Sequence, residues 1–545
     1  MSYHDWKILS RYPKDPISVV LKNRQIKDPE DFFSPDYTAL PKSDDFPGLM
    51  KAAGIIFDAK EKGAKIGLFM DYDADGICGG AIIFKALQQL KIEVEAYIPK
   101  REEGYGLSAS AVSHFKKAGV SLVITVDCGI KNNKEIDLAR QLKMKIIVVD
   151  HHQIGKMPNA DAVVHPLIKK NNKLKFRDYS GGGVAFFLAR ELLQSSGKEK
   201  WFLDLATISS VADVVPLKDA NRTIIKFGLI VLKKTKNPGL KELIRLANLD
   251  PQSLGAYEIG FMIAPRINAA GRISNPRRSF ELLTSEDPKI FKSAARELED
   301  LNRERQDILQ STQDEAINMV LKEKLDRNKI IVLKGRDWNE GIVGLVASRV
   351  VDKFYSPTIV LCEKGEILKG SARSIPGINI TDLIASTGSY LLSFGGHAQA
   401  AGLSLNKNKF KIFNDLIIKY AAKESDQLYK RILRVDAILD IKQISFSLMK
   451  DLDKMQPFGI ANPKPIFGFE NVIVESLQYI GKDKNHCRFS ICKKSDKKQC
   501  IAFRALENGL DLKSGEKVNV AFSLKTSYWQ GQEKIDLIVE DVQKK

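Results

Sequence analysis

Short apolar runs alternate with amphipathic stretches between about residues 45 and 230 of the chain. The apolar runs have the length of β-strands and cover residues 66–70, 94–98, 122–126, 145–149 and 162–164, while the stretches between them have helical spacing. This alternation predicts an α/β fold with a mostly parallel sheet and helices on both faces. Ligands of such sheets bind beyond the carboxyl ends of the strands.

The pattern changes outside this region. Residues 288–325 are highly charged with apolar residues near helical spacing, which predicts a long helix between two domains. Strands at 330–333 and 358–361 indicate a second α/β block, and short alternating strands after about residue 430 predict a small β-barrel. The predicted organisation is an irregular arm (1–44), a first α/β domain (45–284), a connecting long helix (285–326), a second α/β domain (327–429) and a barrel domain (430–545).

Three aspartates, Asp71, Asp73 and Asp75, alternate directly after the first predicted strand. Carboxylates this close repel one another unless they share a cation or a proton, and hard oxygen ligands suit Mg²⁺ or Mn²⁺. An EF-hand calcium loop begins in the same way, but its twelfth position is Ile82 here, and the preceding segment is a predicted strand instead of a helix. A solvated acidic turn is the other alternative. We expect a catalytic site for divalent metal ions.

Further acidic and imidazole groups follow other predicted strands. Asp127 comes after strand 122–126, and Asp150, His151 and His152 come after strand 145–149. Asp213 lies farther along the chain, in a short sequence of small and apolar residues. Imidazole and carboxylate together suit Mn²⁺. Their order and position predict one shared site.

Composition bounds the class of protein. The chain has 545 residues, enough for several domains, and its 85 basic against 67 acidic residues give a net charge of +18, which favours a polyanionic partner. Six scattered cysteines without a Cys-x-x-Cys pair fit a reducing compartment, and no apolar stretch approaches the length of a membrane span. We therefore expect a cytoplasmic protein that does not enter membranes.

The four acidic and imidazole clusters resemble the motifs of the DHH phosphoesterase superfamily, which is named for the triplet matched here by Asp150, His151 and His152. The resemblance implies hydrolysis of phosphodiester or phosphoanhydride bonds with two divalent ions, Mn²⁺ or Mg²⁺. It implies that His152 either acts near the scissile phosphate or supports the metal ligands from behind, and that Asp71 and Asp150 orient ligands. The implied metal ligands are Asp73, Asp75, Asp127, His151 and Asp213. Met70 departs from the superfamily, which usually has Gly at this place.

The second α/β block resembles the DHHA1 domain at two glycine-rich segments, 370–374 and 395–402. In that domain small residues let backbone amides approach a phosphate, while Arg and His contact it. The resemblance implies a catalytic contribution from Arg373 and His397. It implies nucleic-acid contacts at Ser371, Gly395 and Gly396.

Segments 265–272 and 456–465 are similar to the single-strand-specific exonucleases of this superfamily. That similarity implies nucleic-acid contacts at Arg266, Asn268 and Arg272, and an OB-fold for the barrel. Tyr528 and Trp529 are candidates there for stacking on bases, and we place Tyr105 among the nucleic-acid-binding residues, although core packing is equally compatible with its sequence. Residues 180–183 could cradle a phosphate or allow close helix packing. His165 and His114 have the character of ordinary surface or core histidines.

The expected function is therefore a two-metal exonuclease that degrades single-stranded DNA from the 5′ end to 5′-mononucleotides during recombination and repair. We expect a monomer, assisted by a helicase or a single-strand-binding protein. One alternative is a phosphodiesterase for short oligonucleotides or cyclic dinucleotides, which needs neither a barrel nor a charge of +18. The other is a DNA-binding scaffold that has lost its metals, which the intact Asp73, Asp75, Asp127, His151 and Asp213 argue against.

Overall fold

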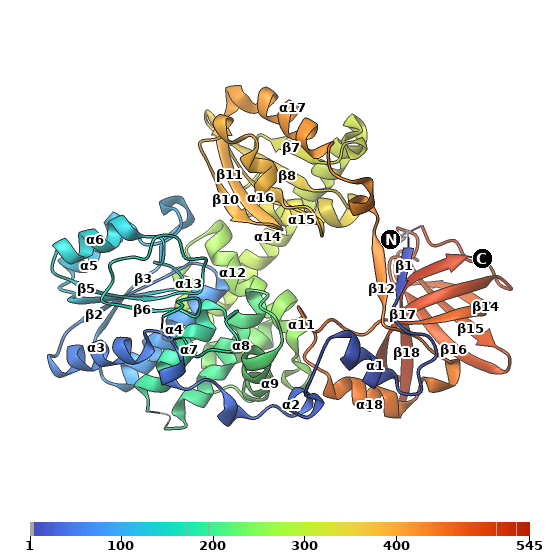
Figure 1. The fold of residues 1–545 in the computed structure, drawn as a ribbon, viewed down its shortest axis with the longest axis horizontal. Coiled ribbons are helices and arrows are strands. Elements are labelled where there is room, and N and C mark those ends of the chain that lie inside the picture. The colour runs from blue at the N-terminus through green and yellow to red at the C-terminus, as the bar shows by residue number, and fades with distance from the viewer. Residues whose placement is uncertain (1–4, 171, 195, 508, 530, 545) are drawn as a thin grey trace.

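The computed structural model describes residues 5–170, 172–194, 196–507, 509–529 and 531–544. The chain forms three lobes, coloured blue to green, yellow to orange, and red (Figure 1). The first two lobes are α/β domains and the third is a β-barrel, which confirms the predicted fold class. Among the described residues, no helix has both the length and the apolar character needed to cross a membrane.

The first lobe contains a five-stranded sheet in the order β3-β2-β4-β5-β6, in which all neighbouring strands are parallel. The predicted strands are confirmed within one residue. The chain crosses from β3 on one side of β2 to β4 on the other, so the switch point of this sheet lies at the carboxyl ends of β2 and β4. The strands are β2 (Ile66–Met70), β3 (Val94–Tyr97), β4 (Leu122–Val126), β5 (Lys145–Val149) and β6 (Ala162–Val164).

Helices cover both faces of this sheet. Two of them, α5 (Ala109–Lys117) and α6 (Asn133–Gln141), pack on one face. The other face carries a larger helical layer whose apolar residues form the main core. That layer comprises α3 (Leu49–Glu61), α4 (Ala74–Gln89), α7 (Gly181–Leu192), α8 (Leu203–Ala212), α9 (Asp219–Leu232), α10 (Pro238–Leu246), α11 (Ala256–Glu258), α12 (Ala264–Ile273) and α13 (Arg277–Thr284).

The unusual Met70 is accommodated by a small residue on the helix above it. A Cβ atom added to Gly80 of α4 would lie 2.2 Å from the Met70 sulfur. The Met70 side chain therefore fills the space that a larger residue at position 80 would occupy.

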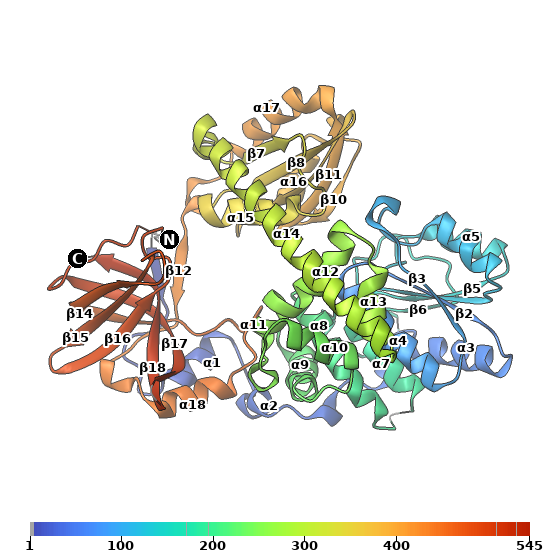
Figure 2. The same ribbon diagram turned by 180° about the vertical axis from the view of Figure 1, so that it is seen from behind.

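The long charged segment forms one helix, α14 (Pro288–Glu323), which runs from the first lobe to the second (Figure 2). The Asp287 side chain caps its start by accepting a hydrogen bond from the Lys289 amide. Arg266 of α12 attaches the helix to the first lobe through Glu299, with 2.6 Å between Nε and Oε2.

The second lobe has a five-stranded sheet in the order β10-β11-β9-β8-β7, of which only the pair β7 and β8 is parallel. Its strands are β7 (Ile331–Gly335), β8 (Thr358–Lys364), β9 (Ile367–Arg373), β10 (Ser393–His397) and β11 (Ala400–Asn406). Its helices are α15 (Val343–Phe354), α16 (Ile380–Ala385) and α17 (Phe410–Ala421). Strand β10 is therefore an edge of the sheet.

The third lobe closes because β14 pairs with both β15 and β17. The barrel-facing residues Val518, Val520, Phe522 and Leu524 are buried on one face of β17, as their alternation predicted. The elements are β12 (Ile432–Val435), β13 (Ala437–Ile438), α18 (Phe446–Lys454), β14 (Phe467–Ile480), β15 (His486–Lys493), β16 (Asp496–Ala502), β17 (Lys517–Trp529) and β18 (Gln532–Lys544).

The N-terminal segment differs from the irregular arm that we predicted. It contains β1 (Asp5–Ile8), α1 (Pro16–Asn23) and α2 (Pro29–Phe33), and β1 pairs in parallel with β12. Val20 and Phe32 belong to the hydrophobic core of the barrel domain. The strand that pairs with β1 lies more than four hundred residues away, so local periodicity carried no sign of the packing.

Candidate metal centre and phosphate site

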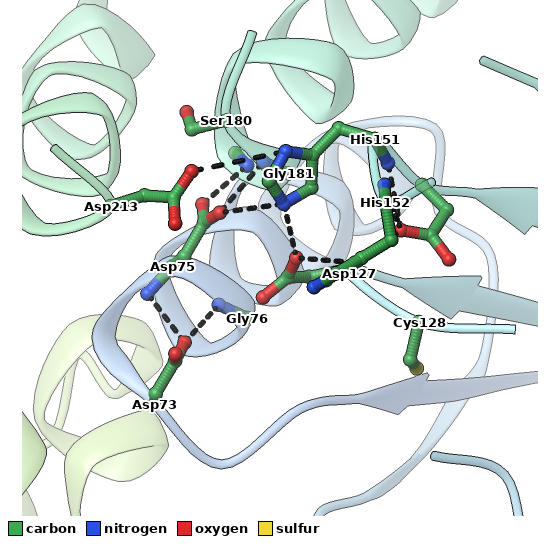
Figure 3. Close-up of polar contacts among 12 residues, drawn as sticks. Asp73, Asp75, Gly76, Asp127, Cys128, His151, His152, Ser180, Gly181 and Asp213 are labelled. Carbon is green, nitrogen blue, oxygen red and sulfur yellow. Dashed lines mark hydrogen bonds and ion pairs between the residues drawn. The ribbon is translucent and has the colours of Figure 1, made fainter. Parts of the chain in front are cut away.

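The acidic and imidazole side chains predicted from the sequence converge at the switch point of the first sheet (Figure 3). Asp75 lies in the first turn of α4, and its two carboxylate oxygens accept hydrogen bonds from the amides of Gly181, at 2.7 Å, and Gly182, at 2.8 Å. The Ser209 hydroxyl donates to the same carboxylate. These donors fix the orientation of Asp75.

The glycines at the start of α7 are needed for this approach. A Cβ atom on Gly181 would lie 2.6 Å from the Asp127 Cβ, and one on Gly182 would lie 2.4 Å from the Ser209 Oγ. Of the two interpretations of residues 180–183, close helix packing is the one observed, and the freed amides hold Asp75.

Asp73 and Asn268 shape the start of α4. The Asp73 carboxylate caps the helix by accepting from the amides of Asp75, at 2.9 Å, and Gly76, at 3.0 Å. The Asn268 side-chain oxygen accepts from the Ala74 amide at 2.8 Å. Asn268 thus supports the acidic loop, and its contact with nucleic acid stays a prediction.

His151 stands at the centre of the cluster. Its Nε2 lies 3.1 Å from Asp127 Oδ1 and 3.6 Å from Asp75 Oδ2, and its Nδ1 lies 3.8 Å from Asp213 Oδ2. Burial lowers the pKa of His151, so the neutral ring keeps a lone pair for a ligand. Asp213 caps the end of α8, and burial together with the carboxylates of Asp75 and Asp73 raises its pKa to about 9.

The arrangement fits divalent cations. Candidate ligand atoms lie within 4.8 Å of one another in three overlapping groups of these residues. The buried oxygens Asp71 Oδ1 and Asp127 Oδ1 accept no hydrogen bond from any described residue. Burial and neighbouring carboxylates raise the pKa values of Asp71 and Asp127 well above the ordinary range. A cation bound among these oxygens would offset the burial and the mutual repulsion that raise these pKa values.

His152 is held beside this cluster by three partners. Its Nδ1 donates to Asp150 Oδ1 at 2.7 Å, and its Nε2 lies 3.1 Å from the Tyr105 hydroxyl. Its carbonyl accepts from Nε2 of the fully buried His165 at 2.8 Å, while His165 Nδ1 accepts from the Leu167 amide. His165 is therefore a core histidine that fixes the Asp-His-His loop.

These contacts set the charge of the triplet. Burial opposes a charge on His152, but the hydrogen bond to Asp150 and the negative charges of Asp150, Asp75 and Asp73 together raise the His152 pKa. Burial likewise opposes the Asp150 charge, yet His152 and backbone amides lower its pKa to about 2. Tyr105 is 54% exposed and donates to the Asp127 carbonyl. Its stacking on a base stays a prediction.

Basic side chains border the acidic loop on the side of the second lobe. Arg272 Nη1 donates to the Gly341 carbonyl at 2.8 Å, across the two lobes. Arg101 Nε donates to the Gly271 carbonyl, and its guanidinium lies over the Tyr72 ring. Burial, Arg101 and other guanidinium groups lower the pKa of Arg272 to about 10, so Arg272 remains charged at neutral pH. The lowered pKa means that nearby carboxylates do not fully compensate its positive charge.

The candidate residues of the second lobe share one face of its sheet. His397 pairs with Ala400, which pairs with Arg373, and the next row contains Gly395, Gly402 and Ser371. His397 and Arg373 are thus two strands, roughly 10 Å, apart. Gly396 lies between these rows on the exposed edge strand β10. The Arg373 guanidinium donates to the Ser371 hydroxyl.

Three other predicted contacts have different surroundings. Arg266 is buried between Glu299 and the Met262 carbonyl, which occupies its guanidinium within the protein. The side chains of Tyr528 and Trp529 lie outside the described part of the structure. Nucleic-acid contact by these residues stays a prediction.

Two residues of the site, Arg101 and Ser209, were not found from the sequence, because their segments have no recognisable motif. The adjacent glycines at 181–183 were the one available signal, because consecutive glycines at a helix start indicate a close approach.

Comparison with known proteins agrees with this geometry. Three family models match the chain: "DHH family, N-terminal domain" at residues 65–212, "DHHA1 domain" at 327–423 and "RecJ OB domain" at 435–541. The matched ranges fall in the three lobes in the same order.

Named relatives extend over most of the chain. The single-stranded-DNA-specific exonuclease RecJ of Escherichia coli is 34% identical over 77% of each chain, and that of Bacillus subtilis is 37% identical over 91% of this chain and 63% of its own. The chain thus spans less than two thirds of the B. subtilis relative. The crystal structure of Thermus thermophilus RecJ in complex with Mn²⁺ has a TM-score of 0.84 at 28% identity, covering 99% of this chain and 80% of that one. The chain belongs to the RecJ family.

Proposed function

We propose that the chain is a metal-dependent exonuclease that hydrolyses single-stranded DNA from the 5′ end and releases 5′-mononucleotides, in recombination and repair. The observation that carries this proposal is the convergence of Asp75, Asp127 and Asp213 around His151. Beside them lie buried oxygens of Asp71 and Asp127 that accept no hydrogen bond from the described residues. The names of the relatives, single-stranded-DNA-specific exonucleases, support the substrate.

Two divalent ions, Mn²⁺ or Mg²⁺, fit this donor set, and the Thermus relative was crystallised with Mn²⁺. The residues that would hold them are Asp73, Asp75, Asp127, His151 and Asp213. Such ions, when bound, lower the pKa of a water molecule and neutralise charge on a phosphoryl oxygen.

The remaining residues prepare the site for a phosphodiester. The amides of Gly181 and Gly182 and the Ser209 hydroxyl hold Asp75 in one orientation. Asp150 keeps the proton on Nδ1 of His152 and turns its Nε2 toward Tyr105. The raised pKa of His152 favours a charged ring, which we propose contacts the scissile phosphate or the leaving oxygen.

Basic groups beyond the acidic loop supply the contacts to the rest of the strand. Arg272 and Arg101 lie between the acidic loop and the second lobe, where Arg373 and His397 share one face. Guanidinium groups bind phosphate through paired, charge-assisted hydrogen bonds. We propose that these four residues bind the phosphates at the 5′ end, and that the barrel domain binds the strand farther along.

The proposal also covers partners and location. We propose that the chain acts as a monomer in the cytoplasm, on single strands that a helicase or a single-strand-binding protein supplies. The six cysteines form no disulfide, and five of them are buried, as expected in a reducing compartment.

The test uses single and double strands of one sequence, labelled at the 5′ or the 3′ end, with Mn²⁺, Mg²⁺ or a chelator. The proposal predicts that the 5′ label appears first as a mononucleotide, from single strands only, and that the chelator stops the reaction. Release of the 3′ label first would reverse the polarity. Hydrolysis confined to cyclic or very short substrates would favour the phosphodiesterase instead.

A further inference from the structure

The metal-ligand residue Asp213 lies on a short strap, residues 213–217, that leaves the end of α8 in an unusual conformation. Val214 has a φ of 58°, in the left-handed region that β-branched residues rarely adopt. Its side chain is among the exposed apolar ones, at 60%, so its own packing does not hold it. Strained backbone of this kind persists only where surrounding contacts determine it.

A loop of the third lobe, residues 455–463, contacts this strap directly. The Leu217 amide donates to the Ile460 carbonyl at 2.8 Å. The buried Leu217 side chain packs against the bare Cα of Gly459, where a Cβ atom would lie 2.6 Å from the Leu217 Cδ1. The strap therefore ends on a surface supplied by a different domain.

The same loop is attached to α9, which follows the strap. Arg222 is buried at the joint, and its guanidinium donates to the carbonyls of Phe32, Met455 and Gln456 at 2.7, 3.1 and 3.0 Å. The guanidinium also lies 3.7 Å from the centre of the Phe32 ring. Asn221 closes the strap from the other side by donating to the Pro216 carbonyl.

The loop is itself rigidly built. The Asn462 amide donates to the carbonyls of Met455 and Pro457, both at 2.8 Å. Gly459 and Asn462 exchange backbone hydrogen bonds, and Arg24 of the N-terminal segment donates to the Asn462 side chain. A rigid loop of this kind can hold the strap that contacts it in one conformation.

We propose that the 455–463 loop is a positioning element for the metal centre, which holds Asp213 in place through Leu217. This proposal rests on the proposed function, because it takes Asp213 as a ligand of the metal ions, and it gives the barrel domain a second role besides binding the strand. It makes Gly459 and Leu217 positioning residues, and it couples the third lobe to the chemistry of the first.

The experiment measures the dissociation constant for Mn²⁺ by calorimetry on the full chain, without DNA. Gly459→Val should push Leu217 aside and weaken Mn²⁺ binding about 10-fold or more, as loss of a group that orients a metal ligand does. The pair Gly459→Val with Leu217→Ala should restore the affinity, because the smaller side chain makes room. Gly468→Val crowds Ile438 of the same domain instead, at 2.7 Å, and should leave the affinity unchanged.

A cycle with Asp213→Asn isolates the route. If the loop acts through Asp213, then Gly459→Val should cause no further loss in the Asp213→Asn background. An equal loss in both backgrounds, or a wild-type affinity for Gly459→Val, would overturn the proposal. Arg222→Met enters the same cycle should Gly459→Val fail to fold. Absence of Mn²⁺ binding by the wild-type chain would instead refute the proposed function itself.

Discussion

The two α/β sheets present their candidate residues in opposite surroundings. In the first sheet Asp71, Asp127 and Asp150 are 4, 2 and 1% exposed at the carboxyl ends of parallel strands. In the second sheet every residue of the edge strand β10, His397 included, is exposed. The charged groups of the first sheet are buried, whereas the glycines and the histidine on the edge strand of the second sheet are exposed to solvent.

We interpret this difference as one between a site for metal ions and a surface for the phosphates of the strand. Buried carboxylates are costly unless a cation compensates them, so a cluster of them indicates a site built for metal ions and a reacting bond. An exposed edge offers backbone groups and free space, which a long chain of phosphates can follow. The two lobes that contain these sheets are joined at Arg272 by its hydrogen bond to the Gly341 carbonyl.

The largest effect is expected from Asp75→Ala in the first lobe. Losing a metal ligand should remove several kcal/mol of transition-state stabilisation, at least about 10³-fold in the rate of hydrolysis. Affinity for single strands should stay within a few-fold, because the basic surface remains. The measurements are single-turnover hydrolysis and fluorescence anisotropy of a labelled strand.

The matched control is Asp137→Ala, which removes an exposed carboxylate from α6 of the same lobe. It should hydrolyse DNA at the wild-type rate. More than a few per cent of activity in Asp75→Ala, in a preparation free of host nucleases, would contradict the assignment of Asp75.

The second sheet should respond differently. Arg373→Ala and His397→Ala should each slow hydrolysis by about 10², since each would remove a group that stabilises charge on a phosphate. Mn²⁺ affinity should stay at the wild-type value in both. Arg327→Ala, an exposed arginine of the same lobe, is the control. Wild-type kinetics in both variants would assign this face to structure alone.

His165 of the first lobe should make the free energy of unfolding depend on pH. Burial lowers the His165 pKa from 6.5 to about 4, so the unfolded chain takes up the proton first as the pH falls. Its contribution to stability is therefore complete above pH 6.5 and is lost between pH 6.5 and pH 4, by up to about 3 kcal/mol. Urea unfolding should show a shallower pH dependence in His165→Ala.

At pH 7.5 the same variant should be destabilised by about 1–3 kcal/mol, because the His152 carbonyl and the Leu167 amide lose their partner. His114→Ala removes a half-exposed histidine paired with Glu95 and should change stability little. An unchanged pH profile in His165→Ala would contradict a neutral, buried His165.

The smallest expected effect is the pH dependence of the thermal stabilisation by Mn²⁺. The raised pKa values of Asp71 and Asp127 mean that these groups stabilise the metal-free fold below their unfolded pKa, and that this stability is lost as the pH rises. Mn²⁺ should therefore raise the melting temperature more at pH 8 than at pH 6. At a hundredfold excess over Kd the gain is about 2.7 kcal/mol. An equal gain at both pH values would contradict the carboxylate cluster as its origin.

Periodicity and strand-end chemistry were sufficient for much of the first lobe. Strands β2, β4 and β5 lie at the predicted residues, and the aspartates that follow them meet because parallel strands end at one edge. The long charged helix was equally evident, because its apolar positions keep one spacing over its whole length.

Contacts made across lobes had no sign in local pattern. Arg272 meets Gly341, and Leu217 meets Ile460, only because separate lobes dock. The helices around Val20 and Phe32 gain their apolar partners from the barrel at the other end of the chain. The sequence of a short segment does not reveal how much tertiary packing stabilises that segment.

The most direct test of the account measures Mn²⁺ binding and DNA hydrolysis in the same samples of wild type and Asp127→Ala. Asp127 is buried and belongs to two of the three groups of candidate ligand residues. We expect two bound Mn²⁺ ions and 5′ hydrolysis for the wild type. Asp127→Ala should lose at least one ion and the activity together. Full Mn²⁺ occupancy with undiminished hydrolysis in Asp127→Ala would contradict the metal centre at this edge of the sheet.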